Sequence, residues 1–198
     1  HVQGLSPIPP RCSLGLDHQG KRVGPKPLVT EFDTQELGKQ NGQLKHQVSW
    51  QVINLKIAIK EISISGSHMN PSFRDKKFVQ VLKETLLGNT SLVEWMIESC
   101  PDVVAADSLE ALADKMQAIN EGIPINKAQM LEDIARYDHQ LDQGKAFHND
   151  DQLRRIAHLR QWRGDKVRTC RFQKLKATKS SPITPHTYQH LSRTQTGG

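Results

Sequence analysis

The chain has 198 residues, of which 36% are hydrophobic and 24% charged, and its formal net charge is +6. This length suits one domain, or at most two, and is enough to bury a core. The composition excludes a chain that is disordered throughout, and the absence of a Gly-X-Y period excludes collagen. No run approaches eighteen apolar residues, so no membrane span is predicted.

Three cysteines, Cys12, Cys100 and Cys170, are odd in number and far apart in the sequence. This pattern excludes a disulfide framework and a CxxC metal knuckle, and it is typical of a reducing, cytoplasmic compartment. The first residues carry no secretory signal and no initiator methionine. We therefore expect the chain to be the inside of a longer polypeptide or a processed product.

Charge is unevenly distributed along the chain. Residues 91–150 hold 12 acidic and 4 basic residues, a balance of −8, and residues 151–198 hold 11 basic and 2 acidic residues, a balance of +9. The two regions can neutralise one another within one domain, or the basic segment 154–179, with Trp162 and Phe172 among its cations, can bind a polyanion. We favour neutralisation, because a solvated basic face is the commoner meaning of such charge, and nucleic acid is not the expected partner.

Two β elements are predicted in the first third of the chain. Residues 1–47 are rich in proline and loops, but residues 13–16 and 21–23 flank a glycine-containing turn and predict a β-hairpin. In residues 48–64, Leu55, Ile57 and Ile59 alternate with other residues, which predicts a half-buried strand. The alternation then shifts, and a bulge or break is expected near Lys60 and Glu61.

Helices are predicted to follow a turn at residues 65–71. The first spans residues 72–86 and places Phe78, Val81 and Leu82 on one face. A shorter helix is predicted at residues 92–98, and a brief strand at residues 103–106.

Residues that typically cap helix N-termini precede two of the later predicted helices. Asp107 and Glu110 form a capping box in which Asp107 is expected to accept hydrogen bonds from the first-turn amides. Asn126 opens the next helix, and a last one is predicted over residues 150–162. The expected buried faces are Leu109, Leu112, Ala113 and Met116 in the first of these helices, and Leu131, Ile134, Ala135 and Leu141 in the second.

Local motifs identify no catalytic centre. The nine histidines show no metal-ligand spacing on a helix, so no metal site is predicted. No GxSxG elbow and no GxGxxG turn is present, so neither a hydrolase triad nor a dinucleotide fingerprint is predicted. The Arg163-Gly164-Asp165 tripeptide matches the short sequence that integrins bind, but three residues recur by chance, so no integrin-binding function is predicted. The catalytic residues therefore remain unassigned.

Seven short segments, in the same order, resemble segments of one enzyme superfamily. They are LDHQGKR (16–22), SWQVINLKI (49–57), SGSHMNP (65–71), VAADSLEAL (104–112), RYD (136–138), GDK (164–166) and SRTQTGG (192–198). This order resembles flavin-dependent dehydrogenases of the fumarate reductase and 3-ketosteroid dehydrogenase superfamily, and most closely the bacterial FAD-binding dehydrogenases.

The resemblance implies an α+β fold, with a small antiparallel sheet and several helices, as the capping or catalytic domain of a two-domain flavoprotein. Residues 1–47 would be a lead-in, residues 48–185 the substrate or catalytic domain, and residues 186–198 the return toward the FAD-binding domain. FAD would be bound mostly by residues outside this chain, so the chain alone is expected to be inactive without the remainder of the flavoprotein. The implied reaction is hydride transfer to flavin from a C–H beside a carbonyl, with a steroid or other ketone as substrate.

Site residues implied by the resemblance lie at the end of the chain. Gly197 and Gly198 would allow close approach to the flavin, and Arg193 would contact substrate. Ketosteroid dehydrogenases place a tyrosine upstream of such glycines to polarise the ketone, but Ile183 and Thr184 stand there, and Tyr188 is not assigned that role. A degenerate relative, or a non-enzymatic module that binds a polyanion, is the alternative interpretation.

Overall fold

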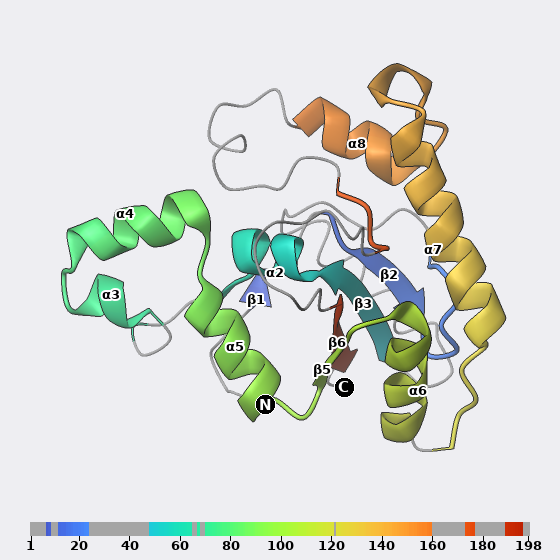
Figure 1. Ribbon diagram of the computed structural model, residues 1–198, viewed down its shortest axis with the longest axis horizontal. Helices are drawn as coiled ribbons and strands as arrows, with labels where there is room; N and C mark the ends of the chain where they lie inside the picture. The colour runs from blue at the N-terminus through green and yellow to red at the C-terminus, as the bar shows by residue number, and fades with distance from the viewer. Residues whose placement is uncertain are drawn as a thin grey trace.

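The computed structural model describes residues 7–8, 12–23, 48–64, 67, 70–120, 122–159, 173–176 and 189–195. Within these residues the chain forms seven α-helices and small antiparallel sheets, so the predicted α+β class is confirmed. Figure 1 shows the sheet at the centre of the molecule, with α7 (Lys127–Asp142) and α8 (Asp151–Leu159) beside it. None of the described helices has the length and apolar character needed to cross a membrane.

The main sheet has four strands in the order β2-β3-β6-β5, and each neighbouring pair is antiparallel. The strands are β2 (Leu14–Asp17), β3 (Val48–Asn54), β6 (Gln189–Gln195) and β5 (Val103–Ala106). A separate two-stranded sheet pairs β1 (Pro7–Ile8) with β4 (Ser63–Ile64). The strand predicted at residues 103–106 is confirmed.

The predicted hairpin after β2 is present, but its return strand is short. Leu16 and Arg22 form a single antiparallel bridge, and Gly20 adopts φ +84° in the turn. The Asp17 carboxylate accepts hydrogen bonds from the Gln19 and Lys21 amides, both at 2.9 Å, which holds the turn together.

The strand predicted over Leu55–Ile59 is wrong, because these residues form helix α2 (Leu55–Glu61). The break falls at Asn54, whose side chain caps the helix by accepting a hydrogen bond from the Ile57 amide at 2.8 Å. A short apolar run fits both the two-residue period of a strand and the 3.6-residue period of a helix. Here the helix buries Ile57 and Ala58, which favours the helical conformation.

The single helix predicted over residues 72–86 is two helices, α3 (Pro71–Arg74) and α4 (Phe78–Leu87). Lys76, at φ +54°, interrupts them. The predicted face of this helix does not enter the core, since Phe78 and Leu82 are exposed. The next helix, α5 (Thr90–Ser99), confirms the helix predicted at residues 92–98.

Helix α6 (Leu109–Ile119) buries the four apolar residues expected of it. Its cap is Ser108, which accepts from the Ala111 amide at 3.1 Å, so the assignment of the cap to Asp107 is wrong by one residue. Asn126 caps α7 as predicted. The predicted face of α7 needs correction, because Ala135 is exposed. The fully buried α7 residues include Met130, Ile134 and Tyr137.

A 3-10 turn at Lys145–Phe147 leads into α8, whose described part begins one residue after the predicted start and ends at Leu159. Residues 160–162 of the predicted helix lie outside the described part of the chain. One hydrophobic core joins the sheet to α2, α6, α7 and α8, with Trp50, Leu112, Ile134 and Ile156 among its members.

Candidate functional site

The segments that carry the family resemblance lie side by side in the fold. Segments 16–22, 49–57, 104–112 and 192–198 contribute β2 with its turn, β3, β5 and β6, which are the four strands of the main sheet. Segment 136–138 lies on α7. Segment 164–166 lies outside the described residues, as does most of segment 65–71. Residues distant in sequence therefore meet around this sheet.

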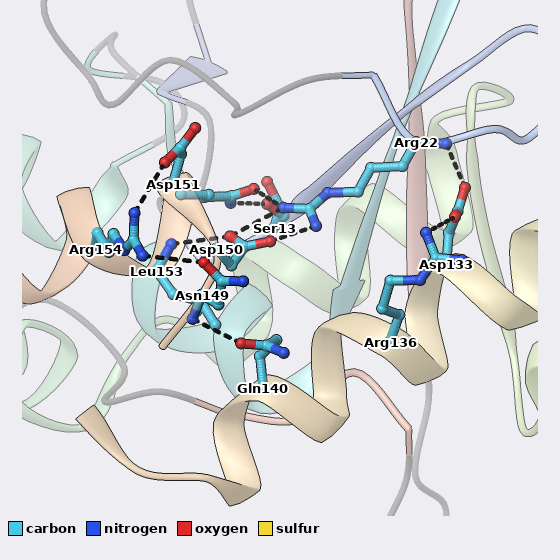
Figure 2. A network of polar contacts seen from close by, with 11 residues as sticks. Ser13, Arg22, Asp133, Arg136, Gln140, Asn149, Asp150, Asp151, Leu153 and Arg154 are labelled. Carbon is cyan, nitrogen blue, oxygen red and sulfur yellow. Dashed lines mark hydrogen bonds and ion pairs between the residues drawn. The ribbon is translucent and has the colours of Figure 1, made fainter. Parts of the chain in front are cut away.

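Arg22, at the end of the hairpin, is the centre of a polar network between the sheet and α8 (Figure 2). Its two terminal nitrogens bind the Asp150 carboxylate at 2.5 and 3.2 Å, and one of them also donates to Gln152 Oε1 at 3.4 Å. The Gln152 amide in turn donates to the Ser13 carbonyl at 2.7 Å. The pair is largely removed from water, because the side chains of Arg22 and Asp150 are 19% and 10% exposed.

Helix α7 completes the surroundings of Arg22. The guanidinium lies 5.3 Å from the centre of the Tyr137 ring, within the range of a cation–π contact. The Arg22 backbone amide donates to the Asp133 carboxylate at 2.9 Å. Arg22 thus connects the hairpin with α7 through its backbone amide and its guanidinium, and with the start of α8 through the ion pair with Asp150.

The electrostatics of this network favour fixed protonation states. Burial works against ionisation of Asp150, but hydrogen bonds and charge from Arg22, with help from the Leu153 and Gln152 amides, hold the pKa of its carboxyl below the ordinary value. Burial raises the pKa of the Tyr137 phenol well above its ordinary value. Asp150 therefore stays ionised and Tyr137 stays neutral near pH 7, and neither is suited to exchange a proton with a substrate.

An open polar hollow of about 510 Å³ lies beside the network. Its lining includes cations and carboxylates in comparable number: Lys21, Arg22, Arg136, Asp133, Asp150 and Asp151. Such mixed charge favours neither an anionic nor an apolar ligand. We therefore interpret the network as a structural contact that holds the hairpin against α7 and α8, and not as a reaction centre.

Arg193, the predicted substrate contact, lies on β6 directly opposite Trp50 of β3. Gly197 and Gly198, the predicted flavin contacts, lie outside the described residues, as do Ile183, Thr184 and Tyr188. Tyr137 lies in motif segment 136–138, but no site role was predicted for it from the sequence. Tyr137 is 1% exposed in the core beneath Arg22, so it does not offer its hydroxyl to a substrate from this position.

Trp50 carries an unusual buried donor. Its side chain is fully buried, and its indole N–H has no hydrogen-bond partner among the residues that the structure describes. The residue stands in the motif segment 49–57, between Leu16 of β2 and Arg193 of β6 in the strand register. In the strand register, the residue predicted to contact substrate therefore lies opposite the aromatic residue of another motif.

No set of described residues fits FAD. A dinucleotide needs backbone amides from a glycine-rich turn for its pyrophosphate and an apolar slot for its ring system. The described hollow is lined by several carboxylates, including Asp133 and Asp150, which would repel the phosphates. In the same residues, no group of three or more histidine, cysteine or acidic side chains could hold a metal ion. We therefore derive no chemical step through a cofactor.

Described cations of the basic segment contact acidic partners. Lys174 lies 2.5 Å from the Asp142 carboxylate, and Arg154 lies 3.7 Å from that of Asp151. Arg154 also donates to the His148 carbonyl and to Asn149 at 3.0 Å each. The Lys174–Asp142 pair joins the basic region to the acidic region, so it favours neutralisation between the two regions over polyanion binding at Lys174. The partner of Arg154, Asp151, belongs to the basic region itself.

Comparison with known proteins identifies curated relatives over nearly the whole chain. The chain is 29% identical over 197 residues to a KsdD-like steroid dehydrogenase of Mycobacterium tuberculosis, and 26% identical over 196 residues to one of Mycolicibacterium smegmatis. Each match covers 98% of this chain but only 34% and 35% of the relative, so the chain spans about a third of their length. No family model and no solved structure matches. The chain is thus similar throughout to part of the KsdD-like steroid dehydrogenases, which confirms the resemblance indicated by its ordered motifs.

Proposed function

We propose that this chain is the substrate-binding or catalytic part of an FAD-dependent dehydrogenase that oxidises a CH–CH group beside a carbonyl. The observation that carries the proposal is the similarity of 98% of the chain to KsdD-like steroid dehydrogenases in two mycobacterial species. The names of these relatives make a steroid ketone the preferred substrate class.

FAD would accept the hydride, and it would be held mostly by residues outside this chain. This agrees with the absence of a GxGxxG turn from the sequence and with the mixed charge of the described hollow. In this proposal, residues 48–185 form the domain that covers the substrate. Residues 1–47 lead into it, and residues 186–198 return toward the FAD-binding domain of a two-domain protein.

The chain's own contribution would be to bind and orient the substrate. The Arg22 network supports this role because it holds the hairpin, α7 and α8 in one arrangement through buried, charge-assisted hydrogen bonds. A rigid frame of this kind keeps groups on the sheet in a constant position, which hydride transfer requires.

A chimera tests the proposal directly. The matched third of the M. tuberculosis relative is replaced by this chain, and the purified protein is mixed anaerobically with a 3-ketosteroid. We expect the flavin absorbance to bleach as the steroid is oxidised, both in the chimera and in the unaltered relative, which serves as the positive control. A chimera that retains FAD and a folded circular dichroism spectrum but shows no bleaching would contradict the proposal and favour a degenerate module.

A second measurement tests where FAD binds. The 198-residue chain is purified alone, incubated with FAD and separated from free flavin by gel filtration. We expect the protein peak to carry no stoichiometric flavin absorbance. A yellow protein with one FAD per chain would show that the cofactor site lies within this sequence.

A further inference from the structure

Helices α3 and α4 form an arm that exposes apolar side chains. Figure 1 shows these helices extending away from the central sheet. We call residues 71–87 the apolar arm. Six of its apolar side chains are half or more exposed: Phe73 (74%), Phe78 (78%), Val79 (84%), Leu82 (59%), Leu86 (50%) and Leu87 (67%). Clustered exposure of this kind marks an interaction surface, unlike single apolar residues scattered over a protein.

The base of the arm is attached to the body of the protein. Lys60 of α2 donates to the Leu86 carbonyl, and the Asn89 amide donates to the Ile59 carbonyl at 2.9 Å. Gly88, at φ +97°, allows this approach, because a Cβ there would lie 2.4 Å from the Ile59 oxygen. The exposed face therefore belongs to an ordered element that the fold holds outward.

The arm is also cationic. It carries four cations, Arg74, Lys76, Lys77 and Lys83, and two carboxylates, for a net charge of +2. Both carboxylates form ion pairs or hydrogen bonds with other residues of the arm. Asp75 pairs with Arg74 at 2.8 Å and with Lys77 at 3.8 Å, and Glu84 accepts from the Ser72 hydroxyl at 2.8 Å and from the Gln80 amide at 3.0 Å. The two carboxylates offset only half of the four cations, so the arm keeps a net positive charge.

The order of these residues favours a lipid surface over a protein partner. Lys76 and Lys77 directly precede the exposed Phe78 and Val79, and Lys83 follows Leu82. Lysine is depleted from the cores of protein interfaces, whereas helices at membrane surfaces combine phenylalanine and leucine with lysine and arginine.

We propose that the apolar arm docks on an anionic lipid surface. Phe73, Phe78 and Leu82 would enter the boundary between head groups and acyl chains, and Lys76 and Lys77 would contact lipid phosphates. The attraction combines burial of apolar area with neutralisation of phosphate charge. This inference depends on the arm alone, so it can fail while the proposed dehydrogenase function holds, and the reverse is also true.

Vesicle flotation with the full chain tests the inference. We expect the protein to float with vesicles of phosphatidylcholine and phosphatidylglycerol in equal parts, and to float less with phosphatidylcholine alone or at high salt. The double variant Lys77→Gln with Phe78→Ser should lower the partition coefficient at least about ten-fold, since one cation contributes roughly five-fold and an inserted phenylalanine more. Both side chains are exposed, so the variant should keep its circular dichroism spectrum.

The matched control is Lys145→Gln with Phe147→Ser, which removes an exposed lysine and a 73% exposed phenylalanine from the 3-10 turn before α8. It should float like the wild type. Equal loss of flotation in both variants, or no flotation of the wild type, would overturn the proposal. Concentration-dependent dimerisation that only the arm variant loses, without vesicle binding, would show that a second copy occupies the face instead.

Discussion

Arg22 makes three different contacts, two through its side chain and one through its backbone amide. Its guanidinium pairs with Asp150, its stem brings the charge over Tyr137, and its backbone amide reaches Asp133. Removing one partner of a buried ion pair leaves the other charge without compensation, which costs more than the pair itself contributes. The network therefore predicts large effects for changes at its centre and small effects at its exposed edge.

Arg22→Ala should lower the free energy of unfolding by about 3 kcal/mol, because Asp150 would remain buried and unpaired. Arg136→Ala is the matched control. Its guanidinium is 62% exposed and pairs with Glu132, which is 63% exposed, and more distantly, at 3.7 Å, with Asp133, so its loss should cost under about 1 kcal/mol. Urea unfolding followed by circular dichroism measures both values. Similar losses in the two variants would show that the Arg22 network does not stabilise the fold.

Asp150 should give the fold part of its resistance to acid. Its folded-state pKa is lower than the ordinary value of 3.8, so its contribution is present above that pH. The contribution is lost as the pH falls through the lowered folded value, because protonation must then break the pair with Arg22. Asp150→Asn removes the titrating group and keeps a residue able to cap α8.

Urea unfolding at a series of pH values compares the two proteins. We expect the wild type to exceed Asp150→Asn in stability at neutral pH, and the difference to shrink toward zero as the solution becomes strongly acidic. A difference that stays constant over this range would contradict the assigned pairing.

At the scale of elements, the junction between α4 and α5 determines where the apolar arm leaves the body. Gly88 ends α4 at φ +97°, and the Asn89 side chain then caps α5 by accepting from the Leu92 amide at 3.0 Å. The close approach of Gly88 to Ile59 of α2 leaves no room for a side chain. The direction of the arm thus depends on a glycine for both conformation and space.

Gly88→Ala should destabilise the protein by about 2–5 kcal/mol, since the left-handed conformation and the clash with the Ile59 carbonyl both oppose a Cβ. Gly122→Ala isolates the first effect: Gly122 has φ +84°, but a Cβ there meets nothing within 4 Å. We expect it to cost about 1–2 kcal/mol. Thermal and urea unfolding measure the difference, and equal costs would show that the approach to Ile59 is not tight in solution.

For the whole molecule, the main sheet collects the segments by which the chain resembles the steroid dehydrogenases. Strand β6, from the end of the sequence, lies between β3 and β5 and pairs with both. Arg193 is thereby placed in a central strand, opposite Trp50. Under the proposed function, the residues that follow β6 would contact the FAD-binding domain.

In the chimeric enzyme described above, Gly197→Val should lower the rate of flavin reduction about 100-fold, because a displacement of about 1 Å removes the reacting atoms from a productive distance. Arg193→Ala should weaken substrate binding while the flavin content stays unchanged. Stopped-flow absorbance measures both. Wild-type rates in both variants would show that this segment only links the domains.

Some elements were predictable from the sequence alone because their signals are local. The spacing of Leu109, Leu112 and Met116 repeats over two turns of one helix, and only one face satisfies it. Asn126 opens α7 by accepting a hydrogen bond from the Gln129 amide, only three residues further along the chain. By contrast, the apolar residues of Leu55–Ile59 fit the period of a strand and that of a helix equally well. Burial of Ile57 and Ala58 in the core favours the helix.

The candidate site depended on the tertiary structure. Arg22 and Asp150 are 128 residues apart, and the sequence holds many other arginines and aspartates that would pair equally well. The resemblance marked the segments of Arg22 and Tyr137, but not their contact, because a motif records residue order and carries no distance. The sequence by itself determined the α+β class, the cap of α7 and the relatives, since these depend on neighbouring residues or on residue order. Only the tertiary structure decided which charges are buried together and which apolar face stays exposed, because desolvation depends on the packing of the whole chain.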